Sequence, residues 1–173
     1  MGVAIRRAGP AEAWGEIRAL VTQAFAFMEG RIDPPSSIHR WIDASCAAAA
    51  SQGTCFLAEG PALPAEGPAS PAEGPVLIGC LFAKPDGSAL HLSKIAVAEA
   101  ARRRGVAHAL IAAAEREAQR RGLTALTLQS RVELTETHAA FAALGFSVVG
   151  RTAHPGYDTP TSLTLSKPIG DRG

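Results

Sequence analysis

The chain has 173 residues, a length that suits one domain built around a single hydrophobic core. Apolar residues make up 47% of it and the formal net charge is only +1, so composition gives no reason to expect nucleic acid or an anionic membrane as a partner. No apolar run is long enough to span a bilayer, and the N-terminus lacks the order of a signal peptide. We therefore expect a cytoplasmic protein with neither kind of partner.

The cysteines, Cys46, Cys55 and Cys80, are odd in number and lack the spacing of metal-binding or redox motifs. We expect them to be reduced, partly buried thiols. No other cluster suggests a metal ligand set, so no metal is expected.

The N-terminal third is predicted to hold a strand over 3–8, helices over 11–28 and 36–52, and a strand over 54–59. The first helix has the clearest pattern, because apolar residues recur at intervals of three and four from Trp14 to Met28. Pro10 suits its first turn, and either Ser36 or Ser37 can cap the second helix.

Between residues 58 and 75 the tetrapeptide Ala-Glu-Gly-Pro occurs three times at a spacing of seven. Proline and glycine at this density favour neither a helix nor a strand ladder. We expect a flexible loop over 61–75, inside the single domain of residues 1–173, and we interpret it as an inert hairpin tip.

The remainder is predicted to hold strands over 76–83, 89–97, 124–130, 146–151 and 162–169, with helices over 105–121 and 135–144. Thr135 is a plausible N-cap of the last helix. The helix over 105–121 connects two strands that should be parallel neighbours. This order of elements predicts an α/β or α+β fold with a mixed sheet.

One turn carries a strong local signal for an anion site. Arg102, Arg103 and Arg104 precede Gly105, where the long helix opens. A helix start leaves backbone N–H groups without intrahelical partners and carries partial positive charge. Glycine allows a ligand to approach the backbone closely. The turn is therefore predicted to bind a phosphate or pyrophosphate.

The segment Ile95-Ala-Val97 followed by Arg102-x-x-Gly105-x-Ala107 resembles the acetyl-CoA motif of the GNAT superfamily of N-acetyltransferases. Leu144-Gly145-Phe146 resembles the second landmark of that family, and the order of elements matches it from about residue 3 to residue 169. The resemblance implies a mixed, mostly antiparallel sheet of about seven strands with about four flanking helices and splayed parallel central strands.

The resemblance also implies a reaction, in which an amine attacks the thioester of acetyl-CoA directly in a ternary complex. The acceptor would be a small-molecule amine or a peptide or protein amine, and a homodimer is a candidate assembly. The N–H of Val97 or a neighbour would face the thioester carbonyl as an oxyanion donor. The residues implied to bind CoA are Ile95, Ala96, Val97, Arg102, Arg103, Arg104, Gly105, Val106, Ala107 and Phe141.

The residues that move protons are less clearly encoded. Many relatives carry a Tyr where this chain has Phe141, so the usual acid for the departing thiolate is absent. Four candidates remain: His91 on the central strand, Glu133 after the next strand, His138 in the last helix and Tyr157 in the final loop. His91 lies where some relatives carry a catalytic Glu, and imidazole has an intrinsic pKa near 6.5.

The acceptor site would be framed by the first two helices and the loop between the last strands. That region offers Phe27, Glu29, Arg31, Asp33, His39, Trp41, His154, Tyr157 and Asp158. Two other classes of function stay open. One is a non-catalytic acyl-CoA-binding regulatory module, suggested by Phe141. The other is a nucleotide-phosphate-binding regulatory domain, although no GxxxxGK[ST] or GxGxxG pattern occurs.

Overall fold

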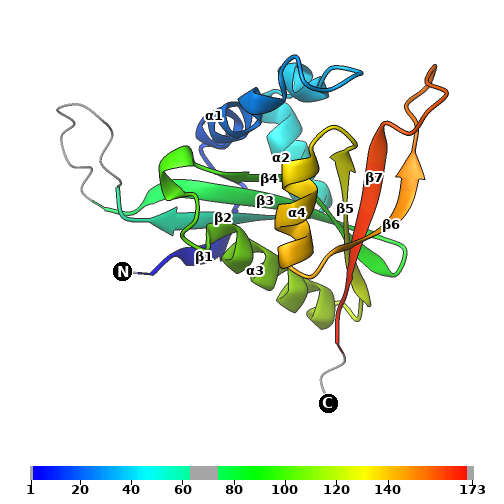
Figure 1. The fold of residues 1–173 in the computed structure, drawn as a ribbon. Helices are drawn as coiled ribbons and strands as arrows, with labels where there is room; N and C mark the ends of the chain where they lie inside the picture. The colour runs from blue at the N-terminus through cyan, green and yellow to red at the C-terminus, as the bar shows by residue number, and fades with distance from the viewer. Residues whose placement is uncertain (1, 63–73, 171–173) are drawn as a thin grey trace.

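The computed structural model, which describes residues 2–62 and 74–170, contains a seven-stranded sheet in the order β1-β2-β3-β4-β5-β7-β6 (Figure 1). The strands are β1 (Ala4–Arg7), β2 (Thr54–Gly60), β3 (Val76–Asp86), β4 (Ala89–Val97), β5 (Ala125–Arg131), β6 (Ser147–Thr152) and β7 (Ser162–Pro168). Within the described ranges β4 and β5 form the only parallel pair. The predicted mixed, mostly antiparallel sheet is therefore confirmed.

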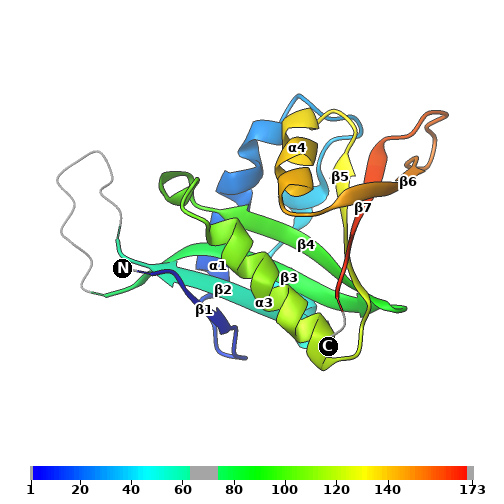
Figure 2. The same cartoon turned by 60° about the horizontal axis from the view of Figure 1, so that its bottom comes forward.

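Helices cover both faces of this sheet (Figures 1 and 2). The helices are α1 (Trp14–Phe25), α2 (Asp43–Gln52), α3 (Val106–Arg120) and α4 (Thr135–Ala143). The buried apolar residues form two clusters, one between the sheet and α3 and the other between the sheet and helices α1 and α2. The apolar stripe of α3, which includes Val106, Leu110 and Ala114, is fully buried against the sheet.

The second predicted helix is broken into two parts, which corrects the expectation over 36–52. A 3-10 turn (Ser37–Arg40) comes first, and Ser36 Oγ caps it by accepting from Ile38 N at 3.2 Å. Trp41 then adopts an extended backbone and α2 begins only at Asp43. Trp41 packs edge-to-face on Phe82 with ring centroids 5.2 Å apart, so tertiary packing overrides the local helical pattern.

Two smaller boundary predictions are also wrong. The residue before α4 is Leu134, and no side chain caps that helix, so Thr135 is its first residue rather than its cap. Helix α1 starts at Trp14, which leaves Pro10 in a preceding turn. A 3-10 turn (Ala26–Met28) continues α1 to the predicted end.

The two central strands diverge, as the resemblance implied. Pairing of β4 with β5 runs from Ala89 opposite Ala125 to Leu92 opposite Leu128 and then stops. Further along β4, the register against β3 shifts between Cys80 and Phe82, and Lys94 takes a left-handed φ of 50°. A bulge of this kind bends a strand and increases its twist. The outer half of β4 therefore leaves its parallel neighbour.

Three further expectations concern the 61–75 loop, the cysteines and membrane-spanning helices. Most of the predicted 61–75 loop falls in residues 63–73, outside the described residues. The thiols of Cys46, Cys55 and Cys80 are free and fully buried, and burial raises the pKa of Cys80 to about 12. No helix in the described part of the chain is long and apolar enough to cross a membrane.

Gly53 offers a test of how tightly α2 is joined to the sheet. A Cβ added there would lie 2.1 Å from the carbonyl oxygen of Ala83, which belongs to a paired strand and cannot move aside. We expect Gly53→Ala to lower the free energy of unfolding by about 2–3 kcal/mol, measured by urea denaturation.

Gly15→Ala in α1 is the matched control for that substitution. Its Cβ would lie 3.4 Å from Asp43 Oδ2, the end of an exposed side chain, which is an ordinary van der Waals distance. Alanine favours a helix interior over glycine by about 0.5–1 kcal/mol, so this variant should be as stable as the wild type or slightly more so. Equal stability of the two variants would contradict the close contact at Gly53.

Candidate active site

A cavity of about 860 Å³ occupies the space that opens where β4 and β5 diverge. Its walls come from the outer halves of these strands, the end of α1 with the segment after it, and one face of α4. The lining from β4 and β5 is His91, Leu92, Ser93, Lys94, Ile95, Ala96, Val97, Leu128, Gln129, Ser130 and Arg131. Strand pairing ends at Leu92 and Leu128, so backbone groups of β4 beyond Leu92 that face the gap lack a neighbouring strand to bond.

The arginine turn lies at one end of this cavity. Arg102 and Ala107 both line it, while Arg103, Arg104 and Gly105 are exposed to solvent. No side chain caps α3, and its first intrahelical bond runs from Ala109 N to Gly105 O. The preceding N–H groups are therefore available to a ligand.

The backbone of the turn is shaped for an anion. Arg103 and Gly105 both adopt left-handed conformations, with φ of 61° and 78°. Alternation of left- and right-handed residues gathers successive N–H groups into a concave anion site. A Cβ at Gly105 would meet nothing within 4 Å, which leaves this part of the turn open. Val106 by contrast is buried beneath the helix, so only its backbone could contact a ligand.

Of the four candidates for proton transfer, His91 lines the cavity and the other three do not. His91 lies next to Leu92, the last paired residue of β4, and its Nδ1 is 3.2 Å from Thr127 Oγ1 on β5. It pairs with Lys84, two residues from Phe82 on β3, so it shares a sheet face with Phe82, which packs beneath α1 and α2. Burial lowers the pKa of His91 below its ordinary value of 6.5, with Asp86 opposing that change.

The other three candidates for proton transfer form hydrogen bonds with loop residues instead. They are His138, Glu133 and Tyr157. His138 Nε2 donates to the carbonyl oxygen of Arg131 at 2.8 Å, since a carbonyl oxygen can only accept. Tyr157 OH donates to Asp33 Oδ1 at 2.6 Å, and Asp33 N donates to Glu133 Oε1 at 3.3 Å. These bonds connect the segment after α1 with the β5–α4 and β6–β7 loops.

Arg131 is a further member of this network that the sequence did not single out. Its guanidinium donates to His154 Nε2 at 3.0 Å and to the carbonyl oxygen of Pro34. Three buried polar atoms lack a protein partner among the described residues: Arg131 Nε, Ser130 Oγ and Glu133 Oε2. Unpaired buried polar atoms are costly, and Ser130 and Arg131 both line the cavity, so these two residues are the ones whose free polar atoms a ligand could satisfy.

Phe141 also lines the cavity, from α4. Its ring packs edge-to-face on Phe146 with centroids 5.6 Å apart, so it is held as part of the wall. Phenylalanine has no proton to donate. Phe141 therefore cannot act as the acid that many relatives carry at this position.

Lys94 lines the cavity and was not among the site residues expected from the sequence. It lies in the bulge of β4, and its ammonium is 5.6 Å from the centroid of the Trp41 ring. Desolvation lowers its pKa from the ordinary value of 10.5. No pattern in the sequence marks a bulge here. Ser130, by contrast, could have been found, because it is a polar residue at the position where the alternation of Leu126 and Leu128 calls for an apolar one.

The sequence matches the acetyltransferase (GNAT) family over residues 39–146, and no curated protein matches it. Solved structures with the same fold include the PaiA N-acetyltransferase from Thermoplasma acidophilum in complex with coenzyme A, at 14% identity and a TM-score of 0.73, covering 97% of this chain and 99% of the other. A GNAT-family acetyltransferase from Staphylococcus aureus Mu50 has 11% identity and a TM-score of 0.71, covering 98% and 100%.

The ribosomal-protein-S18-alanine N-acetyltransferase from Escherichia coli has 19% identity and a TM-score of 0.61, covering 99% of this chain and 97% of the other. At such identities the likeness shows the fold alone. The family match carries more weight, because it spans more than half of the 173 residues and includes β4, α3 and β5, which build the cavity and its arginine turn. The chain belongs to the acetyltransferase (GNAT) family.

Proposed function

We propose that the protein is an N-acetyltransferase that moves the acetyl group of acetyl-CoA to a primary amine by direct attack in a ternary complex. The observation that carries this proposal is the continuity of one cavity, from the arginine turn at Arg102, through the gap between β4 and β5, to the segment after α1. A long donor with an anionic end and an acceptor amine can therefore meet inside a single site.

The donor half of the site fits a CoA molecule. Its pyrophosphate is held by backbone N–H groups from Arg103 to Ala107, with Arg102 adding charge at the cavity rim. The unpaired edge of β4 from Ile95 to Val97 supplies donors and acceptors for the amides of the pantetheine arm. An N–H at Val97 or a neighbour supports the charge that develops on the thioester oxygen.

The acceptor half is apolar with a few polar groups, as is common for sites that bind small organic molecules. Its lining from α1 and the segment after it is Ala24, Phe25, Phe27, Met28, Ile32, Ser36 and Ser37. The loops joined through Arg131, Asp33 and Tyr157 hold this wall in place. Ser130 also lines the cavity, and its Oγ, which has no partner among the described residues, can bond a polar group of a ligand.

His91 is the group that accepts the proton from the attacking amine. It lines the cavity where the strands diverge, on the face that carries α1 and α2. Its lowered pKa keeps the imidazole neutral at pH 7, which is the form that can take a proton. The departing thiolate takes a proton from water, because Phe141 cannot donate one.

An acyl-CoA-binding module without catalysis is the second candidate, and Phe141 in the cavity wall favours it. The two are separated by a panel of amines, amino acids and peptides incubated with acetyl-CoA and the protein. We expect thiol release above the slow hydrolysis blank for a subset of amines, with the acetylated product seen by mass spectrometry. Tight CoA binding without amine-dependent release for any acceptor would support the binding module and contradict the enzyme.

A further inference from the structure

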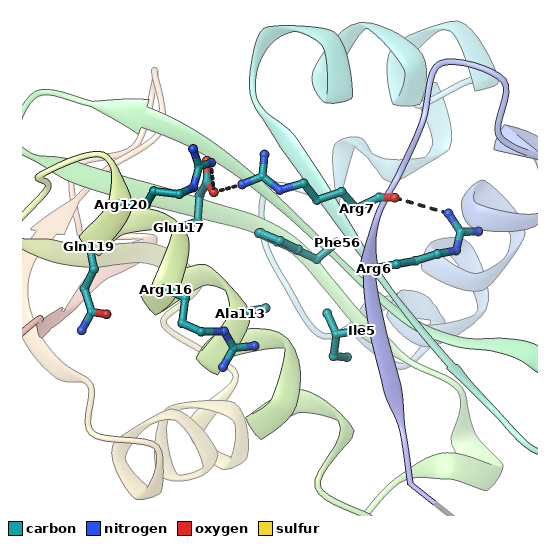
Figure 3. A pocket seen from close by; sticks show the side chains of 9 residues that line it. All are labelled: Ile5, Arg6, Arg7, Phe56, Ala113, Arg116, Glu117, Gln119 and Arg120. Carbon is teal, nitrogen blue, oxygen red and sulfur yellow. Dashed lines mark hydrogen bonds and ion pairs between the residues drawn. The ribbon is translucent and has the colours of Figure 1, made fainter.

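A second cavity, of about 540 Å³, lies on the opposite side of the sheet from the acceptor site, between β1 and the C-terminal half of α3 (Figure 3). Figure 2 shows α3 lying across this face of the sheet. It shares no lining residue with the first cavity. Its lining is Ile5, Arg6, Arg7, Phe56, Ala113, Arg116, Glu117, Gln119 and Arg120. Nothing in the acetyl-transfer proposal uses these residues.

A single buried carboxylate meets three guanidinium groups beside this cavity. The Glu117 side chain is only 1% exposed. Its Oε2 accepts from Arg7 and from Arg120, and its Oε1 accepts from Arg121 at 2.5 Å. One negative charge cannot neutralise three positive ones, so the group keeps an excess of positive charge.

The other acids near the cavity do not remove that excess. Arg6 bonds Glu12 at 2.6 Å and Glu59 at 2.8 Å, and Figure 3 shows its guanidinium directed away from the other arginines. With these two acids and Glu117 set against Arg6, Arg7, Arg116, Arg120 and Arg121, two positive charges remain.

Arg116 carries one of the positive charges, and its sequence neighbours Glu115 and Glu117 are paired with other residues. It makes no hydrogen bond or ion pair with a residue that the structure describes. Figure 3 shows its guanidinium across the cavity from Arg7 and Arg120, with Phe56 and Ala113 between them. Arg7 also lies over the Phe56 ring, 5.7 Å from its centroid. Cationic groups therefore stand on two sides of an apolar floor.

The electrostatics of Arg7 agree with this arrangement. Desolvation lowers the pKa of Arg7, and the like charges of Arg120 and Arg121 lower it further. An added anion would relieve this repulsion. A cavity of this volume is within the usual range for small-molecule sites, and guanidinium groups bind carboxylate and phosphate oxygens through paired N–H donors.

We infer that this cavity is a binding site for a small organic anion, whose carboxylate or phosphate head lies between Arg116 and the Arg7–Arg120 pair and whose apolar body packs on Phe56 and Ala113. This site is separate from the arginine turn, which lies at the other end of α3. The inference does not depend on the proposed acetyl transfer.

Phenyl phosphate is a suitable probe, and phenol is its uncharged match. Calorimetric titration at low salt should give saturable binding of one phenyl phosphate per protein. The control is Arg103→Gln, the same kind of substitution made in the arginine turn, and binding should persist in it. Arg116→Gln should weaken that binding at least about tenfold, because a charge-assisted bond is lost. Arg116 is exposed and unpaired in the described part of the chain, so its replacement should not disturb the fold.

Three results would overturn the inference. Unchanged affinity in Arg116→Gln would show that the cavity does not hold the anion. Loss of phenyl phosphate binding in Arg103→Gln would place the phosphate in the arginine turn instead. Equal affinity for phenol would show that the apolar floor alone binds the ring.

Discussion

Gly105→Asp is expected to lower the affinity for CoA at least about a hundredfold in a calorimetric titration. Gly105 precedes the first residue of α3, among the N–H groups proposed to hold the pyrophosphate. A carboxylate there faces a ligand of like charge, and two unit charges 4 Å apart repel by about 4 kcal/mol at the effective dielectric constant near a protein surface. That energy exceeds the roughly 2.7 kcal/mol that a hundredfold change requires.

Gly105→Asn is the control that separates charge from backbone strain. Asparagine has the shape of aspartate, carries no charge and tolerates the left-handed conformation that Gly105 adopts at φ 78°. A Cβ at this position would meet nothing within 4 Å, so neither side chain is excluded by its size. Gly105→Asn should bind CoA within about tenfold of the wild type. Equal affinities for the Asp and Asn variants would remove the pyrophosphate from this turn.

The sequence predicts the sheet and the arginine turn well because their signals are local. Glycines end the segments, alternation marks strands such as 124–130, and the pattern from Arg102 to Gly105 is read from adjacent residues. The break at Trp41 is different, since its cause is a contact with Phe82 on a distant strand. The apolar pattern of the sequence continues through Trp41, and no local signal predicts that the helix is interrupted there.

The acceptor side of the site is encoded in long-range contacts and could not be read in the same way. Tyr157 and Asp33 are 124 residues apart, yet one hydrogen bond joins them. Tyr157 is therefore placed in the loop network rather than in the cavity, where it had been a candidate for proton transfer. His91 was one of four candidates by position, and only the divergence of β4 from β5 distinguishes it.

His91→Gln is expected to lower kcat about a hundredfold or more, the usual effect of losing a general base. Glutamine can keep a hydrogen bond to Thr127 Oγ1, which is 3.2 Å from His91 Nδ1, but it cannot accept a proton at neutral pH. CoA affinity should be unchanged, because His91 lies next to Leu92, where β4 still pairs with β5, whereas the arginine turn follows the other end of β4. Steady-state kinetics at saturating acceptor, with calorimetry for CoA, measure both quantities.

The pH profile gives this prediction a second, independent readout. Burial disfavours the charged imidazolium and lowers the pKa of His91, so the neutral, proton-accepting form persists to lower pH than in free histidine. Wild-type kcat should therefore rise with pH through a pKa below 6.5 and stay level above it. His91→Gln should lack this inflection. Two acceptors with different amine pKa values separate it from ionisation of the substrate, because only a protein group gives the same inflection with both.

Thr127→Val and His138→Gln complete the test. Thr127→Val removes the hydroxyl beside His91 Nδ1 while keeping the shape of the β5 side chain, so it should shift the inflection and lower kcat less than His91→Gln does. His138→Gln should leave kcat nearly unchanged, since that ring bonds the carbonyl oxygen of Arg131 and does not line the cavity. If His138→Gln instead loses both the rate and the inflection while His91→Gln keeps them, the proton acceptor is His138, and the ligand-bound cavity must reach the His138 side chain on α4.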